Sequence, residues 1–459
     1  MIHAIRGDTH LWLQLLHSKV GVRFFLVIIY LFFKNSVERV HGAGSIKLAK
    51  GPWYDGNPNV KAKSMASTRS LTEHKARRRI WDPGFGPKAL QSYESRVIQH
   101  TQRLSLQLER RNGQVCNMSD WCDFFAFDVM GDLVFGQDFG MLEKAEQHLY
   151  MKFLHQALRV LSIFSHTPWA NPLCKYIFRY DLDRAKTHLT IVPFVPVDAE
   201  TRKEGRKFME ISAQQYQNRK ARGTSREDIF SYLLASDSKG VNLDDDELSA
   251  DSGALIVGGS DTTAVCLTYL LYFLTKYPDT QRRLTEEIDQ LWDGSPEKLN
   301  AKLFATAEYM NGAINESLRL YPPGPNGMQR TIPRGGHVIQ GELVPENTQA
   351  SSSIISRHRR LRNFTHADKF VPERWIDSER PADFVHDTKG FIPFSAGQYA
   401  CIGKNLALAE MRLFLAEVLK KLKLELDDTF NEKVWDAACR SNLSLLKGAL
   451  PVRVYRRER

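Results

Sequence analysis

The sequence predicts a mainly α-helical protein with small β-sheets, folded as a single large domain around one long central helix. Residues 243–277 have an apolar middle, and about 30 residues of helix in this stretch would span about 45 Å. Amphipathic segments at helical spacing cover residues 92–165, and residues 199–222 are predicted to form a charged helix. Of the 459 residues, 42% are hydrophobic, and no Gly-, Ser- or Pro-rich linker divides the middle of the chain. The short segments 338–345 and 441–446 have strand composition and supply the small sheets.

The charge and the cysteines narrow the class of partner and the compartment. The net charge is +10, which suits anionic lipid or an acidic protein partner. No zinc-finger or RNA-binding motif accompanies this charge, so we expect no nucleic-acid partner. The six cysteines are sparse and form no CxxC pair, which indicates a reducing compartment.

The N-terminal segment, residues 1–40, leaves its role open. Residues 24–33 are a run of ten apolar residues, whereas a membrane span needs roughly 20. Extension back to Leu11 reaches that length but takes in His17, Lys19 and Arg23. The segment is therefore a weak membrane anchor, a buried strand or helix, or an incomplete start. We assign residues 41–459 to the main domain.

A helix is predicted from residue 71, closed by Asp82-Pro83-Gly84. His74 and Arg78 are four residues apart and share one face of this helix. Taken alone, this spacing also fits an ordinary solvated basic face.

The central helix begins with acidic residues 244–247, which favour a helix N-terminus, and it ends at Pro278. Its middle contains Gly258-Gly259-Ser260-Asp261-Thr262-Thr263. Two interior glycines cost roughly 1 kcal/mol each relative to alanine, and an aspartate beside threonines is costly in lipid. A membrane span is thus the weaker alternative. Small residues let a flat ligand approach, and the Thr262 hydroxyl can divert a backbone carbonyl and open the helix locally.

Glu316 and Arg319 lie three residues apart on another predicted helix and share a face. A surface ion pair is the common explanation of such a spacing. Apolar neighbours indicate burial instead, and a buried pair needs further partners.

One cysteine lies in a tight loop over residues 394–403, just before an apolar-periodic segment. Gly397 permits backbone angles that other residues resist, and Gly403 permits a close approach of the backbone. Cys401 therefore lies near a helix N-terminus, where the dipole and free amides favour a thiolate. A thiolate in a stiff loop is what a thiolate-ligated haem iron needs, although an isolated cysteine here could also be structural.

This loop resembles the haem-ligand signature of the cytochrome P-450 family, Phe-x-x-Gly-x-Arg-x-Cys-x-Gly. Phe394, Gly397, Cys401 and Gly403 match in register, while Tyr399 stands where the family has Arg or His. The resemblance implies the P-450 fold, with the long helix over haem b, and makes Cys401 the axial iron ligand. The cofactor-binding residues that it implies are Phe394, Tyr399, Cys401, Gly403, His74, Arg78 and Arg330.

The other motifs occur in the family's order. The hexad 258–263 resembles the oxygen-activation motif, which implies that Thr262 hydrogen-bonds the bound oxygen and that Asp261 supplies protons. Glu316 and Arg319, completed by Arg374, resemble a cluster that scaffolds the haem loop.

The resemblance, which is to fungal-type members, implies a haem-thiolate monooxygenase that inserts one oxygen of O2 into a lipophilic small molecule. It implies fungal secondary metabolism or xenobiotic oxidation, an NADPH-dependent flavoprotein reductase as electron donor, and the cytosolic face of the endoplasmic reticulum membrane. The basic run 357–362 is expected on the surface, where it either helps the reductase dock or is simply solvated. One alternative is a haem-binding protein without turnover because of an incomplete N-terminus. Another is an integral membrane protein that uses residues 253–274.

Overall fold

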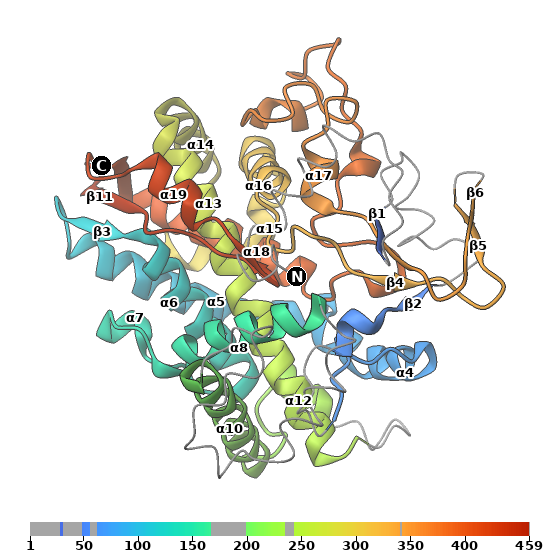
Figure 1. Cartoon of the computed structure of the whole chain (residues 1–459). Helices are drawn as coiled ribbons and strands as arrows, with labels where there is room; N and C mark the ends of the chain where they lie inside the picture. Colours follow the sequence, from blue (N-terminus) through green and yellow to red (C-terminus); the bar gives the residue numbers. More distant parts are fainter. Residues whose placement is uncertain are drawn as a thin grey trace.

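The helices of the chain gather around one long central helix (Figure 1). The computed structural model describes residues 28–30, 48–55, 62–166, 199–234, 243–339 and 342–458. Their helices are α4 (Leu71–Trp81), α5 (Pro87–Glu109), α6 (Met118–Met130), α7 (Met141–Lys144), α8 (Leu149–His166), α10 (Ala199–Ala221), α11 (Ile229–Leu234), α12 (Asp245–Ile256), α13 (Thr262–Lys276), α14 (Pro278–Leu291), α15 (Ala301–Phe304), α16 (Glu308–Leu320), α17 (Ile354–His358), α18 (Lys404–Lys421) and α19 (Glu432–Ala438).

The central helix runs from Asp245 to Lys276 as α12, a π-helical segment Val257–Asp261, and α13. A capping box starts it, because the backbone N–H of Glu247 donates to Asp244 and the N–H of Asp244 donates to Glu247. The predicted helix and its local opening are both confirmed. The helix is long and apolar enough to cross a membrane, but 72% of its most apolar window is buried by the rest of the protein. Its apolar character is therefore that of a core helix.

Two layers of helices cover the central helix. On one side α6 packs against α13 and the π segment, and α5 connects α6 to α18. The rings of Phe125 in α6 and Phe414 in α18 lie 5.3 Å apart, which joins this layer into one hydrophobic core. On another side α16 contacts α13, α14 and α17.

Small sheets lie at the periphery, as predicted. Their strands are β1 (Ile28–Tyr30), β2 (Ala49–Lys50), β3 (Val115–Asn117), β4 (Arg330–Thr331), β5 (His337–Ile339), β6 (Glu342–Val344), β7 (Gln349–Ser351), β8 (Leu422–Leu426), β9 (Ser441–Asn442), β10 (Ser444–Leu445) and β11 (Pro451–Arg456). One sheet has the order β1-β7-β4-β2 and another the order β3-β11-β8, while β5–β6 and β9–β10 are hairpins.

Strand β1 lies within the N-terminal apolar run of residues 24–33. It pairs in parallel with β7, with Ile28 opposite Gln349. Of the alternatives for the N-terminal segment, these three residues therefore adopt the strand and not the membrane anchor. The rest of residues 1–40 lies outside the described residues.

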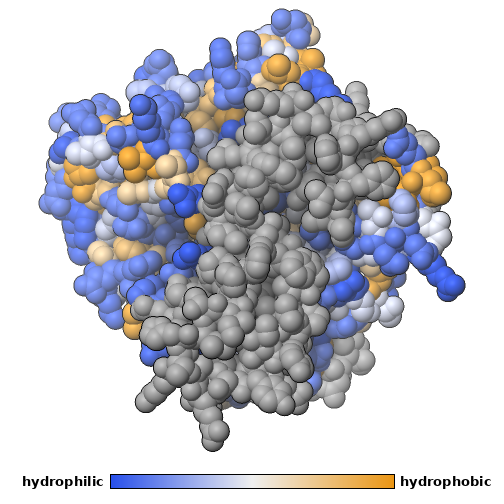
Figure 2. Space-filling model, viewed as in Figure 1, coloured by the Kyte–Doolittle hydropathy of each residue, from blue (hydrophilic) through white to orange (hydrophobic). Residues whose placement is uncertain are grey.

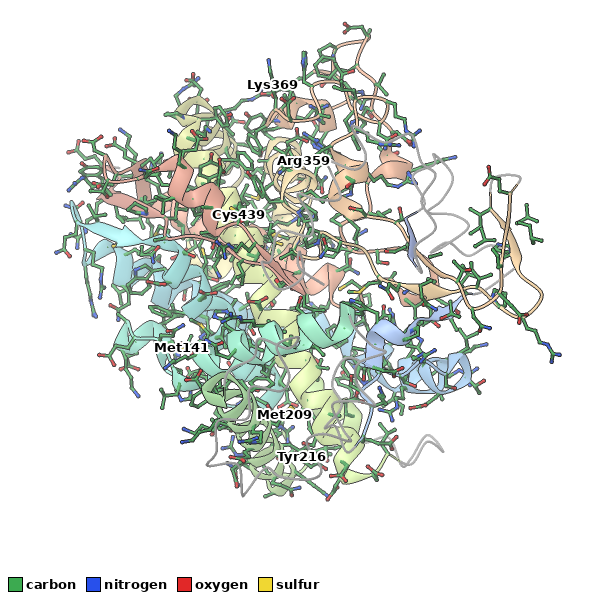
Figure 3. All side chains as sticks on the ribbon, in the orientation of Figure 1. Met141, Met209, Tyr216, Arg359, Lys369 and Cys439 are labelled. Atoms are coloured by element: carbon green, nitrogen blue, oxygen red, sulfur yellow. The ribbon has the colours of Figure 1, made fainter. Side chains whose placement is uncertain are left out.

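The basic run at 357–362 differs from its prediction. Arg357 and His358 are buried in the last turn of the short helix α17, and within the run only Leu361 and Arg362 are exposed. Arg359 turns back onto α16, where its Nη2 donates to the carbonyl of Leu320 at 2.5 Å (Figure 3). Apolar neighbours bury the start of this run, so it is only partly a surface feature.

The described surface in the same orientation is mostly hydrophilic, with apolar side chains in small groups (Figure 2). Val338 and Leu343 are among the exposed apolar residues. They lie opposite each other on the hairpin β5–β6, which projects from the edge of the molecule (Figure 1).

Candidate active site

The Cys401 loop is a closed, stiff turn. The backbone N–H of Cys401 donates to the carbonyl of Phe394 at 2.9 Å, and that of Ala400 donates to Gly397 at 3.0 Å. Gly397 has a φ of 70°, a region that favours glycine, as the sequence predicted. At Gly403 an added Cβ would meet Cys401 Sγ at 3.9 Å, an ordinary contact, so no protein atom requires glycine there.

The Cys401 thiol is accessible, whereas the other cysteines among the described residues are buried. Protein atoms still crowd it, and this desolvation raises the pKa of the thiol. The backbone N–H groups of Gly403 and Lys404, at the start of α18, and the charge of Arg78 act in the opposite direction and favour the thiolate. The loop thus presents one accessible sulfur to which a metal could bind in place of the proton.

An open face of the central helix leads toward this sulfur. Gly258, Thr262 and Cys266 are spaced by four residues and share one face. Gly258 is exposed, and an added Cβ would have no atom of the described residues within 4 Å. Cys266, on the same face, lies near enough to Cys401 for that group to raise its pKa, although burial is the larger cause.

The two glycines of the hexad serve different purposes. A Cβ on Gly259 would lie 2.4 Å from the side chain of Met130, so this glycine lets α6 pack closely on the π segment. From the sequence, both glycines were expected to give a flat ligand room to approach. In the structure only Gly258 borders open space. Thr262 Oγ1 donates to the carbonyl of Gly258 at 2.6 Å, which is the diverted carbonyl predicted from the sequence.

Four predicted cofactor-binding residues meet beside the loop. His74 is buried, and its ring lies edge-on to Tyr399, with ring centroids 4.6 Å apart. Arg330 lies over the same ring at 4.5 Å, and Arg78 Nη1 donates to the carbonyl of Ala400 at 2.9 Å. Burial, followed by the charges of Lys50 and Arg78, lowers the pKa of His74 to about 4.

Lys50 was not singled out from the sequence, because it lies outside every motif identified there. Lys50 is 3% exposed, and its Nζ lies 5.0 Å from the centre of the Tyr399 ring. It donates to the carbonyls of Met65 and Ala66 at 2.9 and 2.8 Å, and among the described residues no carboxylate pairs with it. Burial, then the charge of Arg330, lowers the pKa of Lys50 to about 7. A lysine followed by Gly-Pro-Trp-Tyr is the only signal that the sequence offered.

This cation cluster (Lys50, His74, Arg78 and Arg330) fits an anionic ligand. Arg330 Nε and Nη2 are buried without a hydrogen-bond partner among the described residues. The hydroxyl of Tyr399 likewise has no hydrogen bond of normal geometry there, and burial raises its pKa. Buried donors left unpaired are costly, so their concentration beside one accessible thiol is best explained by the carboxylates of a bound group. The haem propionates have this chemistry, and the residues present therefore fit haem.

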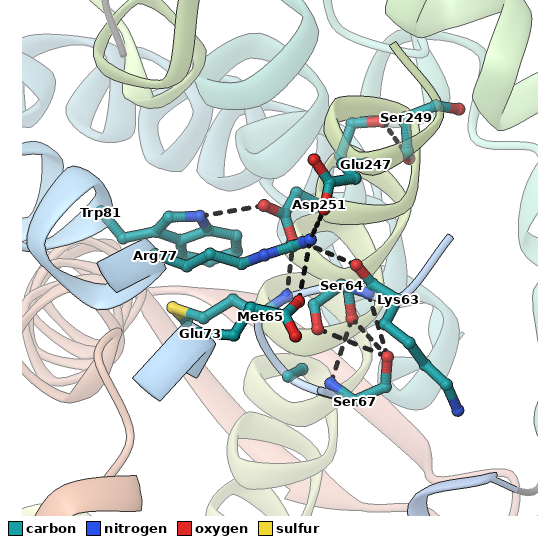
Figure 4. A network of polar contacts seen from close by, with 12 residues as sticks. Lys63, Ser64, Met65, Ser67, Glu73, Arg77, Trp81, Glu247, Ser249 and Asp251 are labelled. Carbon is teal, nitrogen blue, oxygen red and sulfur yellow. Dashed lines mark hydrogen bonds and ion pairs between the residues drawn. The ribbon is translucent and has the colours of Figure 1, made fainter. Parts of the chain in front are cut away.

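A polar network fixes α4, which carries His74 and Arg78, against the central helix (Figure 4). Asp251 of α12 accepts from the backbone N–H of Met65 at 2.6 Å and from Trp81 Nε1 at 3.3 Å. Buried Arg77 pairs with Glu247 and lies 3.8 Å from Asp251. Burial raises the pKa of Asp251 to about 6. Since Lys50 holds the carbonyl of Met65, this network also connects the cation cluster to the central helix.

The predicted cluster of Glu316, Arg319 and Arg374 forms and is fully buried. Arg319 makes two bonds of 2.8 Å to Glu316, and Arg374 Nε makes one of 2.9 Å. The remaining guanidinium N–H groups donate to backbone carbonyls, among them that of His358. His358 Nε2 in turn accepts from the backbone N–H of Ile392, just before the Cys401 loop, at 2.9 Å.

The two predicted catalytic residues face different surroundings. Thr262 lies on the open face, while the side chain of Asp261 is only 4% exposed. Asp261 Oδ1 lies 3.3 Å from Nε2 of His155 in α8, a residue that the sequence did not single out. Burial opposes ionisation of Asp261, but the hydrogen bond and charge of His155 hold its pKa below the usual range.

Comparisons with known proteins agree with this geometry. The family model described as Cytochrome P450 matches residues 27–447. The chain is 34% identical over 418 residues to cytochrome P450 monooxygenase FCK2 of Fusarium pseudograminearum, covering 90% of this chain and 71% of that protein. It is 31% identical over 435 residues to cytochrome P450 monooxygenase astJ of Aspergillus oryzae, covering 92% and 82%. The crystal structure of the cytochrome P450DA heme domain superposes with a TM-score of 0.72 at 21% identity, covering 94% of this chain and 87% of that one, which shows a common fold.

Proposed function

The chain belongs to the cytochrome P450 family, and from this premise we propose which of its residues hold the cofactor, manage protons and meet its partners. It is a haem-thiolate monooxygenase that uses O2, electrons from a redox partner and a small-molecule substrate. The alternative of a haem-binding protein without turnover has no support, since the relatives that this chain resembles are named monooxygenases.

Haem, when bound, supplies reductive activation of O2 and oxidation of the substrate. In our proposal Cys401, which the bond of its N–H to Phe394 holds in place and whose sulfur side is open, would ligate the haem iron. His74, Arg78, Arg330 and Tyr399 would hold the haem propionates. The observation that carries this assignment is that two N–H groups of buried Arg330, next to the Tyr399 hydroxyl, have no hydrogen-bond partner among the described residues.

Asp261 and Thr262 manage protons in the same proposal. Thr262 places its hydroxyl on the open face, at a helix turn that its bond to Gly258 holds open. Asp261 is the buried acid next to it in the chain, so it can pass protons toward that face. Glu316, Arg319 and Arg374 hold the loop in place without touching the reacting atoms.

The finer identity of the partners is also proposed. The net charge of +10 favours an acidic NADPH-dependent flavoprotein reductase and an anionic membrane surface. Exposed Val338 and Leu343 on the projecting hairpin suit contact with lipid. We place the enzyme at the cytosolic face of the endoplasmic reticulum membrane, with residues 1–40 as an N-terminal segment and 41–459 as the catalytic domain. Its substrate is a lipophilic compound of fungal secondary metabolism or a xenobiotic.

The optical spectrum of the reduced, CO-treated protein tests the ligand assignment. We expect a strongly red-shifted Soret band in the wild type and its loss in Cys401→Ser. Cys116→Ser, a buried cysteine of β3, is the matched control and should keep the band. Retention of the thiolate band by folded, haem-loaded Cys401→Ser would show that another group is the ligand.

Thr262→Ala tests the proton assignment. We expect substrate-coupled turnover to fall on the order of tenfold, with more of the consumed O2 released as peroxide. The measurement compares NADPH oxidised with peroxide formed. Unchanged coupling would contradict the role of Thr262.

A further inference from the structure

Asp261 belongs to a cluster of four ionisable side chains, three of which are buried. Asp261 comes from the π segment, Asp123 from α6, His155 from α8 and Lys447 from the C-terminal loop. Lys447 Nζ lies 2.5 Å from Asp123 Oδ1, and these two side chains are 7% and 6% exposed. Four segments far apart in the sequence thus converge on one group of charges.

Charge balance within the cluster depends on His155. Lys447 compensates Asp123, so Asp261 remains as a buried carboxylate whose ion-pair partner among the described residues is His155. Burial opposes protonation of His155, but the hydrogen bond and charge of Asp261 raise its pKa. Asp123 adds to this effect and Lys447 opposes it. Protonated His155 therefore holds Asp261 ionised.

Two further acidic residues, from described elements that contact α8, have partners of their own. Glu204 of α10 pairs with Lys152, and Asp55 bonds to Lys63 and Arg69. His155 consequently responds to Asp261, Asp123 and Lys447.

His155 and Asp261 also differ in solvent exposure. The side chain of His155 is 30% exposed, whereas that of Asp261 is 4% exposed. His155 is thus the member that exchanges protons with water, and Asp261 is the member next to Thr262. An imidazole can accept a proton on one ring nitrogen and donate from the other.

We propose that His155 is the positioning and proton-supplying partner of Asp261, connecting this buried carboxylate to solvent. The inference rests on the role proposed above for Asp261. In each transfer the Nε2–H bond of His155 breaks as an O–H bond forms on Asp261 Oδ1. The neutral imidazole keeps the proton on its other ring nitrogen. Asp261 passes its own proton on to the reaction, whose electrons come from the redox partner, and the freed Nε2 of His155 then takes a proton from solvent, which restores the ion pair.

The test compares His155→Gln, which keeps a polar side chain but cannot titrate, with the wild type. The control is Lys152→Gln, one turn earlier on α8 and 56% exposed. NADPH oxidation, O2 consumption and peroxide release are measured with a flavoprotein reductase in substrate-free holoprotein, in H2O and in D2O, from pH 6 to 9. We expect His155→Gln to slow O2 consumption on the order of tenfold, enlarge the solvent isotope effect and remove a titration from the pH profile. Lys152→Gln should match the wild type.

His155→Lys separates charge from proton transfer, since it restores the cation, but an ammonium, with a reference pKa of about 10.4, releases its proton far less readily than an imidazolium, with a reference pKa of about 6.5. We expect it to remain slow, and full rescue would overturn the relay. A readout independent of turnover is the NMR titration of labelled histidines in the reduced CO form. The signal lost in His155→Gln should titrate above the ordinary histidine value of about 6.5 and move down in Asp261→Asn.

The outcomes also separate this inference from the proposed function. If Asp261→Asn slows O2 consumption while His155→Gln does not, the relay is wrong and the role of Asp261 stands. If neither variant changes the rate of O2 consumption, the relay through His155 and the proposed role of Asp261 are both wrong.

Discussion

Two groups of buried arginines in this protein have opposite surroundings. In the scaffold cluster, Arg319 and Arg374 share Glu316, and their remaining donors reach backbone carbonyls. In the cation cluster, Arg330 is equally buried but keeps two N–H groups unpartnered, next to Lys50, which has no carboxylate among the described residues. A satisfied buried charge holds the fold together, whereas an unsatisfied one is explained by a ligand.

Loss of Glu316 should give the largest effect. Glu316→Ala leaves two buried guanidinium groups without their carboxylate and should lower the free energy of unfolding by about 3–5 kcal/mol. Chemical denaturation of apoprotein and holoprotein measures it. Arg282→Ala, which breaks an exposed pair with Glu286, is the control and should cost less than about 1 kcal/mol. Equal losses in the two variants would contradict the scaffold role.

In contrast to Glu316, Arg330 should matter for haem binding and not for the stability of the apoprotein. Arg330→Met removes charge-assisted bonds to the ligand and should weaken haem binding by about 1.5–3 kcal/mol, roughly tenfold to hundredfold. Transfer of haem to an excess of apomyoglobin measures the loss. In the apoprotein the same change removes unpaired buried donors, so the free energy of unfolding should hold or rise. Destabilised apoprotein with unchanged haem retention would place Arg330 with the scaffold.

The adjacent glycines extend this contrast to the central helix. Gly259→Ala forces a methyl group against Met130 and should cost about 1–3 kcal/mol of stability. Gly258→Ala meets no protein atom and should gain about 0.5–1 kcal/mol in the apoprotein. Thermal unfolding of the two variant apoproteins measures both changes in stability. If Gly258→Ala lost as much stability as Gly259→Ala, protein atoms would have to fill the space next to Gly258.

Tyr399→Phe should give the smallest effect. The hydroxyl has no hydrogen bond of normal geometry among the described residues, so its removal should leave apoprotein stability unchanged. Haem affinity should fall by about 0.5–1.5 kcal/mol, the worth of one neutral hydrogen bond. Haem transfer kinetics compare it with Arg330→Met, and an equal or larger loss at Tyr399 would make the phenol the principal anchor.

Short-range patterns in the sequence were enough to predict much of this. The turn at Gly397 in the Cys401 loop, the bond of Thr262 to the carbonyl of Gly258 and the acidic start of the central helix act over a few residues, and all three formed as predicted. The basic run at 357–362 was misplaced because its burial depends on α16, which is distant in sequence. For the same reason, one glycine of the hexad proved to be a packing residue.

The sequence by itself determined the cysteine loop, the long helix and the order of the motifs, because spacing along the chain fixes which residues share a turn or a face. Only the tertiary structure decided that Lys50 joins His74 and Arg330, and that His155 meets Asp261. Those pairings depend on which segments bury one another. Burial also decides whether a charge is solvated, paired or left for a ligand.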